Sequence, residues 1–138
     1  MLMFKIKLMK SINLVFFSLF SILLGAQQKQ HSAFDAISKS DLVSLATYLD
    51  DNVELCFNEN VNFLDKEAAI KELKSFLEKN PTKSLTPIHN GASKGKGSHF
   101  YIGMLNSTNG KSFRVYLYTE LIGGKAVIKE LRINKEGN

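Results

Sequence analysis

The chain has 138 residues, with 18 Lys and Arg against 13 Asp and Glu, and a formal net charge of +5. This length suits one globular domain, and the single cysteine excludes an internal disulfide framework. Three of the lysines and none of the acids lie in residues 1–26, so the remainder carries 15 basic and 13 acidic residues. That near balance gives no support to a nucleic-acid-binding protein, and we expect no nucleic acid partner.

Residues 1–26 have the pattern of a secretory signal peptide, with a basic start, a short apolar run and a small residue at the end. The apolar run, residues 12–24, is interrupted by polar side chains and falls short of the roughly 20 residues that span a bilayer. We therefore expect a mature chain that starts near Gln27, is periplasmic or extracellular, and has no membrane contact. Met1 and Met9 are both candidate start positions.

The mature N-terminus, residues 27–32, is polar and predicts disorder, and residues 33–138 predict one α+β domain. Apolar residues recur at helical spacing between residues 33 and 49, with one interruption near Ser40. They are Phe34, Ile37, Leu42, Leu45 and Leu49. We expect two short helices, the second capped by Ser40 or Asp41.

Two short strands and a long helix follow. The strands are predicted at residues 53–57 and 61–64, and the first places Cys56 as a small buried residue. Asp65 is a favourable N-cap for an amphipathic helix, which Asn80 and the following proline end.

The remainder predicts an antiparallel meander. Its strands are expected at residues 84–89, 99–106, 111–120 and 126–134, with hairpin turns at Asn109–Gly110 and Gly123–Gly124. Helices that precede such a sheet predict an α+β fold, with three helices packed on a curved antiparallel sheet of about four strands.

This order of elements resembles the cone-shaped nuclear transport factor 2-like superfamily, and within it the bacterial secreted family called domain of unknown function 4783. The residues that carry the resemblance are Phe76 to Pro81, Ile102–Gly103, Ser107 to Gly110, Arg114 to Tyr116 and Leu131–Arg132. The resemblance implies a cone with a cystatin-like fold and pairing through the sheet face. It implies no activity, because the superfamily contains isomerases, dehydratases, transport adaptors and binding modules.

The register of the first hairpin predicts which side chains share a face. A two-residue turn at Asn109–Gly110 would pair Met104 with Val115 and Ile102 with Leu117. The expected core face then carries Phe100, Ile102, Met104, Phe113, Val115 and Leu117. The expected outer face carries His99, Tyr101, Arg114, Tyr116, Tyr118 and Glu120.

The last strand has two possible registers. A two-residue turn at Gly123–Gly124 would direct Glu130 and Arg132 into the core, whereas an odd loop or a β-bulge would direct Val127, Leu131 and Ile133 there. We expect the second register, because burying each aliphatic side chain gains roughly 1.5 to 3 kcal/mol and an unpaired buried charge is unfavourable.

The sequence therefore favours a non-catalytic binding module, and the resemblance implies that its specific form is a homodimer. Its expected contact residues are Arg114, Tyr116, Tyr118 and Arg132, where aromatic and charged side chains interleave. An ion pair of the arginines with Glu54 or Glu130 is the structural alternative.

A small-molecule enzyme or carrier that uses the interior of the cone is the functional alternative. It would use Glu130 and Arg132 as a buried pair, with an unidentified ligand. Glu54, Glu130 and Tyr101 are the nearest candidates for acid–base chemistry, but no spacing connects them. His89 and His99 have no paired ligand nearby in sequence, so we expect no metal and no cofactor.

Overall fold

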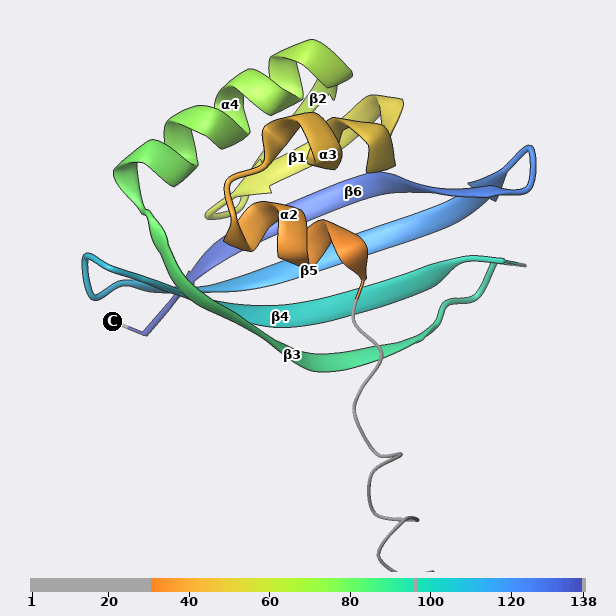
Figure 1. Ribbon diagram of the computed structural model, residues 1–138. Coiled ribbons are helices and arrows are strands. Elements are labelled where there is room, and N and C mark those ends of the chain that lie inside the picture. Colours follow the sequence, from red (N-terminus) through yellow and green to blue (C-terminus); the bar gives the residue numbers. More distant parts are fainter. Residues whose placement is uncertain (1–30, 96, 138) are drawn as a thin grey trace, which may run out of the picture.

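The computed structural model describes residues 31–95 and 97–137 (Figure 1). The predicted signal peptide, residues 1–26, lies outside the described residues, as do residues 27–30. Within the described part, no helix is long and apolar enough to cross a membrane.

Three helices form where the sequence predicts them. They are α2 (Ser32–Ser38), α3 (Leu42–Tyr48) and α4 (Lys66–Lys79). Asp41 caps α3 by accepting a hydrogen bond from the Ser44 amide, and Asp65 caps α4 in the same way through Ala68. Asn80 ends α4, as predicted.

The start of α2 corrects one expectation. Residues 31 and 32 were expected to be disordered, but α2 begins at Ser32 and the His31 side chain accepts a hydrogen bond from the Ala33 amide. Histidine is not one of the usual N-cap residues, so the sequence offered no signal for a helix start at this point.

Six strands form one sheet. They are β1 (Leu49–Phe57), β2 (Asn60–Asp65), β3 (Thr82–Ala92), β4 (His99–Ser107), β5 (Ser112–Ile122) and β6 (Lys125–Glu136). Their spatial order is β2-β1-β6-β5-β4-β3, and all neighbours are antiparallel except the parallel pair of β1 and β6. The α+β class is confirmed, but the sheet is mixed and has six strands rather than about four.

The three helices lie on one side of the curved sheet (Figure 1). α4 covers β1 and β2, whereas α2 packs on β3 and α3 contacts β6. We call the opposite side, which no described helix covers, the helix-free face. The space between helices and sheet is filled by one apolar cluster, whose largest fully buried members include Phe34, Ile37, Leu45, Leu73, Leu117 and Leu131.

The register of β4 against β5 differs from the expectation by one residue. Met104 lies opposite Arg114, and Ile102 lies opposite Tyr116. The cause is a three-residue loop, residues 108–110, in which the Ser107 amide donates to the Lys111 carbonyl oxygen. Gly110 has a φ of 84°, the left-handed conformation that completes a type I turn with a bulge.

This shift reverses the faces of β4, because side chains alternate along a strand. Leu105 joins the core, whereas Phe100, Ile102 and Met104 lie on the helix-free face. His99 and Tyr101, expected outside, lie on the side of the helices: their partners across the ladder are Thr119 and Leu117, and both of these are buried.

The register of β6 matches the favoured alternative. Tyr118 pairs with Glu130, but Thr119 pairs with Ile128, so Lys129 is an extra residue in a bulge. Leu131 and Ile133 are fully buried, as expected. Val127 is also buried, with 9% exposure, but it lies outside the main apolar cluster, which Ile128 joins beyond the bulge.

Candidate contact surface on the helix-free face of the sheet

The four contact residues expected from the sequence do lie on one face. Arg114, Tyr116 and Tyr118 alternate along β5, and Arg132 pairs with Tyr116 across the β5–β6 ladder. All four point away from the helices, and each retains solvent exposure. The register error of β4 adds Phe100, Ile102 and Met104 to the same surface.

An ion triad occupies the centre of this surface. The Arg132 Nη2 atom donates to Glu54 Oε1 at 3.0 Å, and the Arg132 Nε atom donates to Glu130 Oε1. The hydrogen bond to Glu130, followed by the nearby charges of Glu130 and Glu54, raises the pKa of the Arg132 guanidinium. The two carboxylates are therefore held by the arginine and not left as free acids or bases.

Arg132 therefore forms the ion pairs with Glu54 and Glu130 that the sequence offered as the structural alternative to ligand binding. Its two acidic partners were both identified as candidates, and the parallel pairing of β1 and β6 brings them together. Glu130 and Arg132 lie on the helix-free face and not in the interior of the cone, so they do not form the buried pocket pair of the carrier hypothesis.

Aromatic side chains extend from the triad toward β4. The rings of Tyr116 and Phe100 stack with centroids 6.4 Å apart, and the Phe100 ring also contacts His89 at 5.5 Å. Burial, and then the Glu130 carboxylate, raise the pKa of the Tyr116 hydroxyl above its ordinary value. The hydroxyl is therefore a neutral hydrogen-bond donor near neutral pH, and it has no feature of a general base.

The surface around the triad carries both polar pairs and an exposed aromatic side chain. Arg114 makes an exposed ion pair with Glu136 at 2.8 Å, and Tyr118 donates to Glu120 at 3.2 Å. On β2, the Phe63 side chain faces the same way as Glu54 and is 79% exposed. The sequence did not single out Phe63, although the alternation of residues 61–64 was sufficient to place it on the other face of the strand from Leu64, which is partly buried against the core.

The helix-free face also has a hollow of about 330 Å³ beside the triad. Its lining residues are Asn52, Glu54, Phe63, Tyr118, Glu120, Lys129 and Glu130. Three of the charged groups that line it are ion-paired, because Lys129 bonds Asp50 at 2.6 Å and Glu54 and Glu130 bond Arg132. The fourth, Glu120, accepts a hydrogen bond from Tyr118. The hollow is therefore a depression in the helix-free face in which Arg132 holds both carboxylates of the triad.

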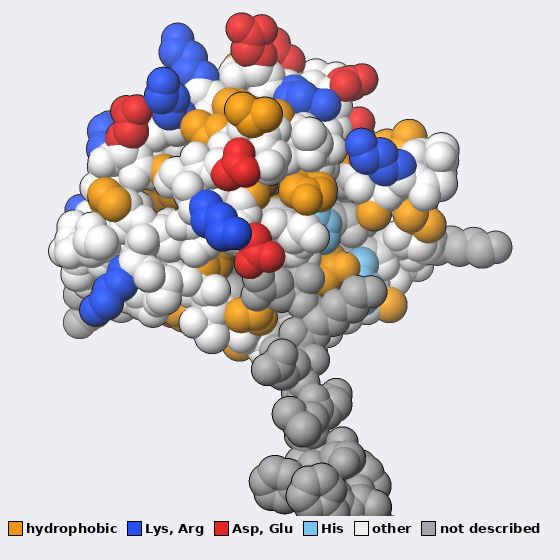
Figure 2. Space-filling view, viewed as in Figure 1, with side chains coloured by type: hydrophobic (Ala, Val, Ile, Leu, Met, Phe, Trp, Pro, Cys, Tyr) orange, Lys and Arg blue, Asp and Glu red, His pale blue; other side chains and the backbone are white. Residues whose placement is uncertain are grey.

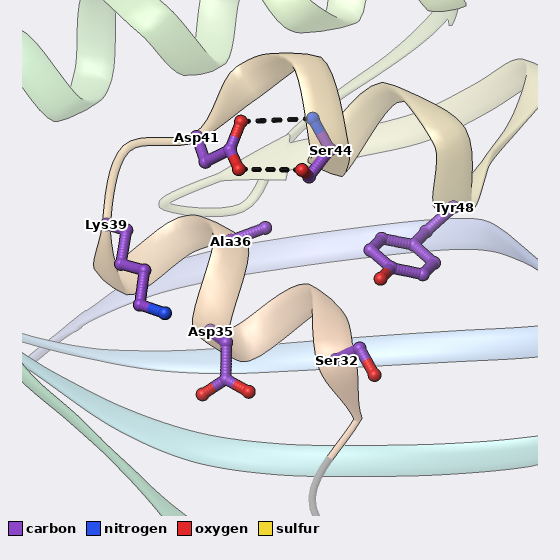
Figure 3. Close-up of a pocket in the computed structure, with 7 residues that line it drawn as sticks. All are labelled: Ser32, Asp35, Ala36, Lys39, Asp41, Ser44 and Tyr48. Carbon is purple, nitrogen blue, oxygen red and sulfur yellow. Dashed lines mark hydrogen bonds between the residues drawn. The ribbon is translucent and has the colours of Figure 1, made fainter.

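A second hollow, of about 200 Å³, lies between α2 and α3 (Figure 3). Asp35 and Lys39 border it from α2, and Tyr48 borders it from α3. Asp41 points toward Ser44 and accepts hydrogen bonds from its amide and hydroxyl, so its carboxylate caps α3. This hollow is on the side of the helices and includes none of the contact residues expected from the sequence.

The remaining candidates have structural roles. Cys56 is buried and is a free thiol, as expected. His99 contacts the Tyr101 ring and lies 3.2 Å from Asn90 through its Nε2 atom. Among the described residues there is no group of three or more His, Cys, Asp or Glu side chains that could hold a metal ion.

Two of the solved structures similar to the chain are described as DUF4783 family proteins. A protein from Bacteroides ovatus described as a DUF4783 family protein is 28% identical, with a TM-score of 0.72, over 82% of this chain and all of that chain. A second from Bacteroides fragilis is 27% identical, with a TM-score of 0.70, over 79% of this chain and all of that chain.

A more distant structure shows the fold alone. An NTF2-like protein from Cytophaga hutchinsonii is 16% identical, with a TM-score of 0.57, over 74% of this chain and 88% of that chain. A search among curated proteins finds no match. The model of the family described as "Domain of unknown function (DUF4783)" matches residues 31–134. Because that match covers most of the chain, the protein belongs to the DUF4783 family, and its fold is NTF2-like.

Proposed function

We propose that this protein is a non-catalytic binding module that forms a homodimer through the helix-free face of its sheet. The proposal rests on one observation, which is that apolar and aromatic side chains gather on that face. Phe100, Ile102 and Met104 lie beside Tyr116 and Tyr118, and no described helix covers them. Phe63 and Val61 extend the apolar surface to the edge strand with 79% and 45% exposure.

Large exposed apolar side chains on a sheet face are characteristic of interaction surfaces. Aromatic residues and arginine are enriched where protein interfaces are energetically strongest. The four residues expected from the sequence fit that composition, and the three apolar residues of β4 enlarge it. The described helices present a different surface, rich in lysine and acidic side chains (Figure 2).

A second copy of the chain is the partner that the charges favour. The face carries both signs, in the Glu54–Arg132–Glu130 triad and in the Arg114–Glu136 pair. A twofold interface brings the same patch of both subunits together, and a patch with both signs can complement itself. A stable interface of ordinary size buries about 800 Å² on each partner, which six strands with an uncovered face can supply.

Sedimentation velocity on paired variants tests the proposal. The double variant Arg114→Ala and Tyr116→Ala should sediment as a monomer at concentrations where the wild type is dimeric. A matched control is Lys71→Ala with Glu72→Ala, two exposed residues of α4 on the opposite side of the molecule. Unchanged association of the sheet variant, or equal loss in the α4 control, would contradict the sheet-face dimer.

The carrier or enzyme alternative has no comparable support. It requires room in the interior of the cone, and buried aliphatic and aromatic side chains occupy that space. Its proposed pair, Glu130 and Arg132, lies on the other side of the sheet. We therefore assign any binding to the helix-free face.

We also propose that the domain acts after export. This rests on residues 1–26, whose basic start and short apolar run are those of a signal peptide. N-terminal sequencing of the protein recovered from outside the cytoplasm should begin near Gln27. Recovery of an unprocessed chain from the cytoplasm alone would contradict export.

A further inference from the structure

A histidine caps the first described helix, and its position is unusual. The backbone amide of Ala33 donates to the Nδ1 atom of His31 at 3.0 Å. Because the amide supplies the hydrogen, Nδ1 must carry a free lone pair, so the ring is neutral with its proton on Nε2. A protonated ring would carry a hydrogen on both nitrogen atoms and could not accept this bond.

The His31 ring is wedged between α3 and the sheet. It contacts the Tyr48 ring of α3 at 5.5 Å and the Tyr101 ring of β4 at 5.0 Å, both edge to face. His99 of β4 also contacts the Tyr101 ring, with centroids 4.7 Å apart. Histidine surface is visible beside hydrophobic surface beneath the helices (Figure 2).

The surroundings of His31 disfavour the protonated, positively charged form of its ring. Burial by the two tyrosines, and then the charge of His99, lower the pKa of His31 below the ordinary histidine value. Asn90 of β3 engages His99 and carries no charge. Asp35 is the acidic residue in the first turn of α2, and its side chain is exposed.

The helix that His31 caps closes the sheet on the side of β3 and β4. Phe34 of α2 is fully buried, and its ring lies close to the backbone of Gly103 and near the side chain of Leu85. α2 has only seven residues, so an isolated helix of its length is unstable and depends on its cap and its packing. Loss of the cap therefore weakens the attachment of α2 to β3 and β4.

We propose that protonation of His31 is an acid-sensitive switch that uncaps α2 and loosens it from β3 and β4, exposing the core beneath it. Two consequences of one proton act together. The hydrogen bond to the Ala33 amide is lost, and the new charge is repelled by His99 when that ring is also charged. The switch does not depend on how the helix-free face is used, because α2 lies on the opposite side of the sheet.

The direction of the pH dependence follows from the lowered pKa. The unfolded chain takes up a proton at His31 near pH 6.5, whereas the folded chain resists it, so the unfolded state holds more protons in that range. The stabilisation by neutral His31 is complete above about pH 6.5 to 7 and is progressively lost as the pH falls below that value.

Nuclear magnetic resonance of the purified protein tests the switch at two levels. Long-range ¹⁵N correlation of the imidazole should identify the Nε2–H tautomer of His31 at about pH 7.5. Hydrogen-exchange protection of the Ala33 and Ile37 amides should fall at least about fivefold between pH 7.5 and 5, the factor that corresponds to loss of a typical N-cap.

Two variants separate the switch from general acid sensitivity. His31→Asn supplies a strong N-cap that does not titrate, so its protection of the α2 amides should stay constant over the same range. His99→Gln removes the neighbouring charge and should move the His31 titration to higher pH while leaving the cap intact. The Nδ1–H tautomer at pH 7.5, or an equal loss of protection in His31→Asn, would overturn the proposal.

Discussion

Arg132 and Glu54, 78 residues apart in the sequence, are joined by a hydrogen-bonded ion pair of 3.0 Å across the parallel strands β6 and β1. Glu130 completes the triad from the same strand as the arginine. These contacts connect the two segments of the sheet on the helix-free face, where the six-stranded order depends on one parallel pairing.

Replacing Arg132 tests how much this triad contributes to the unfolding free energy. Arg132→Ala leaves Glu54 and Glu130 side by side with no cation between them, and we expect a loss of about 1 to 2 kcal/mol in unfolding free energy after allowing for solvent screening. Urea unfolding measures it. Lys66→Ala, which removes an exposed ion pair with Asp51 that includes none of the proposed contact residues, is the control and should cost roughly 0.5 kcal/mol or less. Equal losses in both variants would contradict a special role for the triad.

Gly103 tests the packing of α2 on the sheet. A methyl group at this position would lie 3.0 Å from the Phe34 ring and 3.1 Å from the Leu85 side chain. Gly103→Ala should therefore destabilise the domain by about 1 to 3 kcal/mol, the usual range for overpacking a core. Combining it with Phe34→Leu should cost less than the sum of the two single changes, because the smaller side chain makes room. Simple additivity would show that the two residues do not compete for space.

Asp41 tests the contribution of a helix cap to acid stability. Its hydrogen bonds with Ser44 lower the pKa of the carboxyl group below its ordinary value. The folded state therefore holds fewer protons than the unfolded state near that pKa, and the stabilisation is present above about pH 4 and lost as the pH falls further. Thermal unfolding of Asp41→Asn, which keeps a good N-cap without a charge, should show a smaller drop between pH 6 and 3 than the wild type. An identical drop would exclude Asp41 as a source of that pH dependence.

Local signals in the sequence were sufficient for most of the helix ends and for the approximate positions of the strands, although β1 begins at Leu49 and not at residue 53. Asp41 and Asp65 are strong N-caps, and Asn80 with the following proline ends α4, because these residues determine the backbone within one turn of themselves. The parallel pairing of β1 with β6 could not be predicted in this way. It joins segments near opposite ends of the domain, and no turn connects them.

The candidate site was predicted in part for the same reason. Side chains alternate between the two faces along a strand, so Arg114, Tyr116 and Tyr118 of β5 share one face. This grouping could be predicted without knowing which residues they pair with on the neighbouring strands. The faces of β4 depended on the loop before Lys111, and one additional loop residue moved Phe100, Ile102 and Met104 to the outside. For β6, the unfavourable burial of Glu130 and Arg132 correctly indicated a bulge, although it did not locate the bulge at Lys129.

Sedimentation equilibrium of the wild-type protein over a wide concentration range is the decisive test of the homodimer. We predict a concentration-dependent mass that approaches that of two chains, and weaker association when Phe63, an exposed residue of the helix-free face, is replaced by Ser. A single-chain mass at every concentration would contradict a homodimer formed through this face.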